Sequence, residues 1–167
     1  EHIVFKGTRK RSALEVAETF DRIGAAVDAF TTKDMVAFTI KVLPEYFIEA
    51  VALLGEMLFE PELEPRLVKL EPDGVCEATQ EALDTPEDRL HDAFAGQLYG
   101  NHARGRPILG SPGVVRTFSP DLLRRQHQRL FSRANLIISM AGNIMAGFHE
   151  VVAETFARSG PNDPAGP

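Results

Sequence analysis

The residues best suited to chemistry in this chain stand at its start, where Glu1 is followed directly by His2. These two residues match the last two letters of the zinc-binding motif H-x-x-E-H, whose two histidines lie on one face of a helix. The first histidine of the motif would lie three residues before Glu1, outside the sequence. A catalytic zinc takes three protein ligands and keeps one position open for water. The alternative is an ordinary solvated helix turn in which an acidic residue happens to precede a histidine.

Further stretches follow the first two residues in a fixed order. They are Phe5-Lys6-Gly7-Thr8, residues 22–31 with Asp34, residues 84–92, residues 105–110, Asn135-Leu136-Ile137 and Ala141-Gly142-Asn143. With these stretches, residues 1–158 resemble the insulinase and mitochondrial-processing-peptidase family of zinc metallopeptidases, and in particular its bacterial, processing-peptidase-like branch. The resemblance implies the first of two related domains, a metallopeptidase-like domain at 1–158 that is truncated at its start.

The resemblance also implies the roles of the site residues. Glu1 would be the general base that takes a proton from a zinc-bound water, and His2 would be the second histidine ligand of the Zn²⁺ cofactor. The family's third ligand is a distant glutamate. Glu77 and Ala78 both lie at a suitable distance from His2, but an ungapped count back from residues 84–86 puts Ala78 in the ligand position. Since adjacent helical residues point about 100° apart, Glu77 can replace it only if the helix is locally rewound.

Three outcomes for the third ligand therefore stay open: Glu77, Glu71 as a substitute, or none. Pro72 and Gly74 oppose a regular helix here, which is compatible with either rewinding or a degraded site. We thus expect either a zinc-dependent endopeptidase domain or a non-catalytic, peptidase-like binding or assembly subunit. Because relatives close their site with a second related domain or a partner chain, this chain by itself is expected to be inactive.

The resemblance places an extended peptide substrate on an edge strand that contains Ala29, Phe30 and Thr31. Such a strand binds a peptide through main-chain hydrogen bonds with little side-chain selectivity. Asp28 stands where many relatives carry asparagine, which puts a charge near this substrate path. An ordinary hairpin strand is the alternative interpretation.

The elements that must position these residues are helices alternating with short antiparallel strands. Capping signals at Ser12-Ala13-Leu14-Glu15, Thr85-Pro86 and Ser119-Pro120 predict helix starts, and alternating apolar residues predict strands. The pattern indicates an α+β fold in which helices are layered on an antiparallel sheet. The expected helices are 12–23, 44–59 (with Phe47, Ile48, Val51, Leu54, Met57 and Leu58 facing the core), 67–83, 85–99, 119–131 and 146–158; the expected strands are 25–31, 35–43 and a buried one at 136–141, and residues 100–113 are a predicted loop.

Composition limits the classes of partner. The chain has 167 residues, a formal net charge of -6 and a pI near 5.4, which argues against nucleic acid as the main partner. It contains no apolar run long enough for a membrane span. The single cysteine, Cys76, cannot form an internal disulfide. Residues 159–167 are rich in proline, glycine and polar residues, so we expect them to form a disordered tail.

Overall fold

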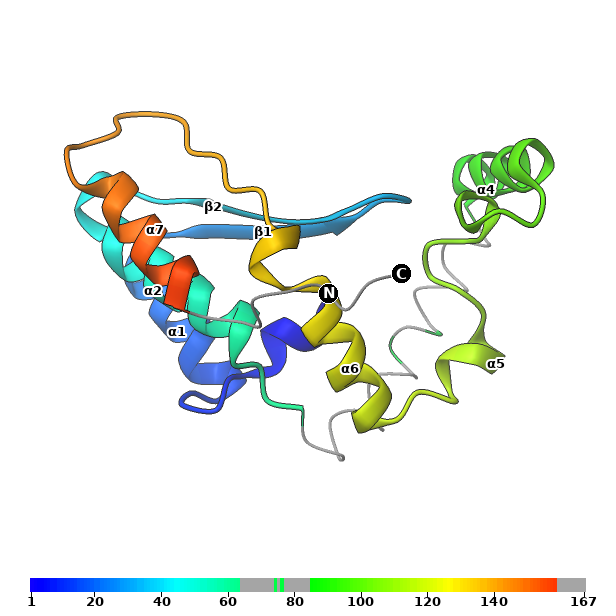
Figure 1. Ribbon diagram of the computed structural model, residues 1–167, viewed down its shortest axis with the longest axis horizontal. Coiled ribbons are helices and arrows are strands. Elements are labelled where there is room, and N and C mark those ends of the chain that lie inside the picture. The colour runs from blue at the N-terminus through cyan, green and yellow to red at the C-terminus, as the bar shows by residue number, and fades with distance from the viewer. Residues whose placement is uncertain (64–73, 75, 77–84, 159–167) are drawn as a thin grey trace.

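The computed structural model describes residues 1–63, 74, 76 and 85–158, in which helices accompany a β-hairpin (Figure 1). None of the described helices has the length and apolar character needed to cross a membrane. The helices and strands are η1 (His2–Lys6), α1 (Ala13–Arg22), β1 (Ala26–Thr31), β2 (Val36–Lys41), η2 (Pro44–Tyr46), α2 (Phe47–Phe59), α4 (Pro86–Tyr99), η3 (Ala103–Gly105), α5 (Pro112–Val115), α6 (Pro120–Leu130), η4 (Arg133–Asn135) and α7 (Phe148–Arg158).

Strands β1 and β2 form the predicted antiparallel hairpin, in which Ala26 pairs with Lys41 and Thr31 pairs with Val36. Side chains along β1 alternate between exposed and half-buried positions, as expected for a strand with one face on a core. Val27, Phe38 and Ile40 lie on the core face. The α+β layering predicted from the sequence is therefore confirmed.

The core lies between this face of the hairpin and helices α1, α2 and α7, which gather on one side of the sheet (Figure 1). Helices α2 and α7 pack so closely at Gly55 that an added Cβ would lie 2.5 Å from Cγ2 of Thr155. Ring contacts between Phe47 and Phe148 join the same two helices. The buried apolar residues of this core are Val4, Val16, Phe20, Ile23, Ala50, Leu53, Met57, Leu58, Val152 and Phe156.

The helix starts inferred from capping residues are confirmed. Ser12 accepts a hydrogen bond from the backbone N–H of Glu15, and the Glu15 side chain accepts one from the Ser12 backbone, which completes a capping box. The backbone and hydroxyl of Ser12 also hold the pKa of the Glu15 carboxyl below its usual value. Ser119 caps α6 through the N–H of Leu122. Local hydrogen bonding thus fixes where these two helices begin.

Some expectations were wrong. Residues 136–141 form no strand, and the Ile137 side chain is 95% exposed. A strand needs a paired edge, and among the described residues β1 and β2 pair only with each other. Ile48 points outward from α2 because the buried face of that helix is set by Ala50, Leu53 and Met57 instead. The predicted loop at 100–113 contains η3 and the start of α5.

Candidate active site

The segment that carries Glu1 and His2 is held on the core by an apolar anchor. Val4, two residues further along η1, is only 1% exposed and belongs to the central cluster. Glu1 is half-buried, whereas His2 is exposed. The backbone N–H of Val4 donates to the carbonyl of Glu1 over 3.1 Å, which closes the first turn of η1. The predicted base, Glu1, and the predicted metal ligand, His2, therefore lie at the N-terminal end of a segment that is fixed on the core.

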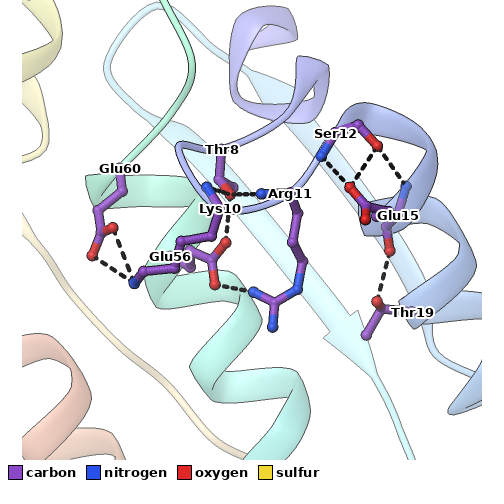
Figure 2. A network of polar contacts seen from close by, with 8 residues as sticks. All are labelled: Thr8, Lys10, Arg11, Ser12, Glu15, Thr19, Glu56 and Glu60. Carbon is purple, nitrogen blue, oxygen red and sulfur yellow. Dashed lines mark hydrogen bonds and ion pairs between the residues drawn. The ribbon is translucent and has the colours of Figure 1, made fainter.

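A polar network fixes the other end of the same segment (Figure 2). The buried hydroxyl of Thr8 donates to Oε1 of Glu56 on α2, and the guanidinium of Arg11 pairs with Oε2 of the same carboxylate. The Thr8 hydroxyl also accepts from the backbone N–H groups of Lys10 and Arg11, at 3.1 and 3.0 Å. Because Glu56 receives two donors, including a charged one, the turn at 8–11 is tied firmly to α2.

The end of β1 contacts the candidate base directly. The hydroxyl of Thr31, the last residue of β1, donates a hydrogen bond to Oε2 of Glu1. The structure thus brings together two predicted site residues that lie 30 positions apart in the sequence. Sequence reasoning placed both in the site but contained no signal for this contact.

The remaining residues of the predicted peptide-binding strand divide between its two faces. Ala29 is half-buried on the side of Thr31, whereas Asp28 and Phe30 are exposed on the opposite face. One edge of β1 pairs with β2, and no other described strand pairs with its second edge. An edge of this kind can accept an extended peptide through main-chain hydrogen bonds.

Sequence reasoning missed a set of ionic contacts at the tip of the hairpin. Nζ of Lys33 lies 2.8 Å from a carboxylate oxygen of Asp92 on α4 and donates to the carbonyl of Arg106 over 2.7 Å. Arg104 of η3 forms a two-pronged pair with Asp34, at 2.9 and 3.1 Å, and this hydrogen bonding raises the pKa of the guanidinium. The sequence signal for these contacts was the pair of adjacent, oppositely charged residues Lys33 and Asp34 in the turn between the two predicted strands. We call these contacts the tip contacts.

His127 on α6 is a structural residue. Its Nε2 lies 2.8 Å from the carbonyl of Leu58, and its ring stacks on Phe131 with a centroid separation of 4.8 Å. Burial lowers the pKa of this imidazole below 6.5, because a charged ring would lose solvation there. A neutral ring that donates its Nε2–H to Leu58 satisfies the contact.

The described residues do not form a metal site. His2 offers an exposed imidazole, a normal zinc ligand, and Glu1 stands beside it as the carboxylate of the motif. Within residues 1–63, 74, 76 and 85–158, no three histidine, cysteine, aspartate or glutamate side chains gather closely enough to hold a metal ion. The candidate third ligands Glu71 and Glu77, and Ala78 with them, lie outside the described residues. The donors present are therefore of the right kind but do not form a complete set.

Comparisons with known proteins agree on one family. A model of the insulinase family (Peptidase family M16) matches residues 1–112. An uncharacterized zinc protease of Bacillus subtilis (strain 168), YmxG, is 38% identical over 156 residues, which are 93% of this chain and 38% of that protein. A crystal structure of a protease from Helicobacter pylori matches with a TM-score of 0.91 and 20% identity, over 99% of this chain and 40% of that one. The peptidase M16 inactive domain from Pseudomonas fluorescens matches with a TM-score of 0.87 and 17% identity, over 99% and 41%.

Proposed function

Because the chain belongs to the insulinase family (Peptidase family M16), we propose that the protein containing it is a zinc-dependent endopeptidase that hydrolyses extended peptides. His2 and Glu77, with a histidine three residues before Glu1, would hold the zinc ion. Bound zinc would supply a water of near-neutral pKa. Glu1 would take the proton of that water and pass it to the leaving amine.

The observation that carries this proposal is the position of Glu1. Glu1 directly precedes the fixed η1 segment and His2, and its carboxylate accepts a hydrogen bond from Thr31 at the end of β1. A general base must lie within reach of the scissile bond, and a peptide paired with β1 would run past this point. The proposed site therefore combines a carboxylate, an imidazole and an edge of β1 with which no other described strand pairs.

Peptide binding would use the main chain of Ala29, Phe30 and Thr31. An added strand gains its affinity from backbone hydrogen bonds, which suits a peptidase that accepts many sequences. Asp28 and Phe30 on the exposed face of β1 would meet alternate side chains of the bound peptide. The carboxylate of Asp28 would favour a basic side chain opposite it.

A second related domain, on the same chain or on a partner, would complete the site. The chain spans 38% of the length of YmxG and 40% of the Helicobacter pylori protease. Among the described strands, a peptide added to the second edge of β1 would pair with β1 alone. A second domain would enclose the peptide and exclude water from the reacting bond.

The test is hydrolysis of an unstructured peptide by the full gene product, with and without a chelator. The proposal predicts cleavage that the chelator abolishes and added zinc restores. Glu1→Gln should remove cleavage while zinc stays bound, and His2→Ala should remove both. Glu18→Gln, an exposed carboxylate on α1, is the matched control and should change neither. Cleavage that persists in Glu1→Gln would contradict the role of Glu1.

Ala78 favours a second candidate function. If the residue in the ligand position is alanine, the protein lacks the third zinc donor and would serve as a non-catalytic binding or assembly subunit that keeps the peptide-binding strand. The two candidates differ in zinc content. The enzyme should carry zinc as purified, and the binding subunit should bind a peptide through β1 without cleaving it.

A further inference from the structure

We infer that Thr31 is a positioning residue for Glu1, and that its hydroxyl orients the carboxylate for proton transfer. This role rests on the proposed function, because it has meaning only if Glu1 acts as the base. The observation behind it is the hydrogen bond from Oγ1 of Thr31 to Oε2 of Glu1. Position 31 therefore has a task beyond the main-chain contacts expected of the strand.

The geometry of β1 explains why this hydroxyl reaches Glu1. Residues 27, 29 and 31 share the half-buried face of the strand, because side chains alternate along it. Val27 packs against the apolar core, and Ala29 has no polar atom in its side chain. Thr31 is the member of this row that offers a hydrogen-bond donor, and it stands where the row meets the start of η1.

The hydroxyl acts on a side chain that needs orienting. A glutamate side chain has three rotatable bonds and can adopt several rotamers. A donor on one oxygen selects among them. Misplacement of a reacting group by about 1 Å can lower a rate on the order of 100-fold, so a single orienting bond has a measurable effect.

The same residue links substrate binding to the base. The backbone of Thr31 belongs to the strand that the peptide would pair with, while its side chain touches Glu1. The two contributions are separable, since main-chain pairing affects peptide affinity and the hydroxyl affects the chemical step. Removal of the hydroxyl alone should therefore lower kcat and leave KM nearly unchanged.

The experiment compares Thr31→Val, Thr31→Ser and Thr39→Val in the full gene product. Valine keeps the branched shape that a strand favours but has no hydroxyl, and serine keeps the hydroxyl. Thr39 on β2 is the matched control. Its hydroxyl donates to the carbonyl of Asp28 over 3.5 Å, so the same substitution there removes a hydroxyl whose hydrogen bond does not involve Glu1. For each variant, kcat, KM, zinc content and melting temperature are measured.

We expect Thr31→Val to lower kcat by about 10- to 100-fold with KM changed less than about twofold. Zinc content and melting temperature should stay as in the unaltered protein. Thr31→Ser should restore most of kcat, and Thr39→Val should behave as the unaltered protein does.

The outcomes separate two failures. Zinc-dependent hydrolysis that Thr31→Val leaves unchanged, or lowers only through KM, would overturn the role of Thr31 and leave the proposed function standing. An equal loss of kcat in Thr31→Ser would also overturn it, because the effect would then not come from the hydroxyl. Absence of chelator-sensitive hydrolysis by the unaltered protein would overturn the proposed function and this role together.

Discussion

The region around the hairpin and the region around α4 are held together by different forces. In the first, η1, α1, α2 and α7 bury a continuous apolar cluster, and Val4, Ile23 and Met57 are 1%, 1% and 0% exposed. In the second, residues 85–118, the apolar stripe of α4 faces outward, with Leu90, Phe94 and Leu98 at 67%, 64% and 60% exposure. We call these regions the core region and the α4 region.

The α4 region meets the hairpin through the tip contacts rather than through a shared core. Lys33 and Asp34, at the tip, pair with Asp92 and Arg104. Figure 1 shows this end of the hairpin pointing toward α4. These side chains are partly exposed, so each pair stabilises the structure weakly. Burial thus fixes the segment carrying Glu1, whereas within the described residues α4 meets the hairpin through a few charged pairs.

The largest effect should come from the core region. Met57→Ala removes a fully buried side chain and should lower the free energy of unfolding by about 2 to 5 kcal/mol, through lost burial and the cavity left behind. Ile48→Ala, on the same helix but 58% exposed, should cost about 0.5 kcal/mol or less. Urea denaturation followed by circular dichroism measures both. Similar losses in the two variants would contradict the assignment of the core.

A smaller effect should come from the start of α1. Ser12→Ala removes the side-chain acceptor of the capping box and should cost about 1 kcal/mol. Ser12→Thr keeps a hydroxyl at the cap and should lose far less. The same urea experiment gives both values, and an unchanged midpoint in Ser12→Ala would show that the capping box does not hold this helix.

A local effect should come from the tip contacts. Asp34→Asn removes the charge that pairs with Arg104 and should loosen the α4 region only slightly, because both side chains are largely exposed to solvent. Amide hydrogen exchange should quicken in residues 86–105 and stay unchanged in α1 and α2. Asp121→Asn, which breaks an exposed pair with Arg124 on α6, is the control and should leave α4 unaffected. Faster exchange throughout the core region would refute a local role.

The smallest effect should appear as a pH dependence. Since burial lowers the pKa of His127 in the folded protein below 6.5, the unfolded chain takes up the proton more readily. The stability associated with the neutral ring is present above pH 6.5 and is lost as the pH falls through the folded-state pKa. His127→Gln should reduce the difference in urea midpoint between pH 7.5 and pH 5, whereas His91→Gln, exposed on α4, should not.

Sequence patterns that involve neighbouring residues predicted the helices and strands well. Capping residues Ser12 and Ser119 predicted the starts of α1 and α6, and alternating apolar residues predicted the hairpin, because each of these features depends on residues close in sequence. Residues 136–141 carry a strand-like apolar sequence but form none among the described residues, since a strand also requires a distant partner.

The candidate site could be predicted only in part, for a similar reason. The motif letters at Glu1 and His2 and the strand around Thr31 are visible in the sequence, but their contact spans 30 positions and depends on how η1 packs against β1. The tip contacts span 59, 70 and 73 positions and likewise have no local pattern. The third zinc ligand stays a prediction, because Glu77 and Ala78 lie outside the described residues.

The proposal that His2 and Glu77 of this chain hold a zinc ion is tested most directly by the zinc content of the full gene product purified without added metal. The unaltered protein, Glu77→Gln and Ala78→Glu are compared. We expect about one zinc ion per chain in the unaltered protein and a marked loss in Glu77→Gln. If only Ala78→Glu retained zinc, the peptidase proposal would be contradicted and the binding-subunit candidate would replace it.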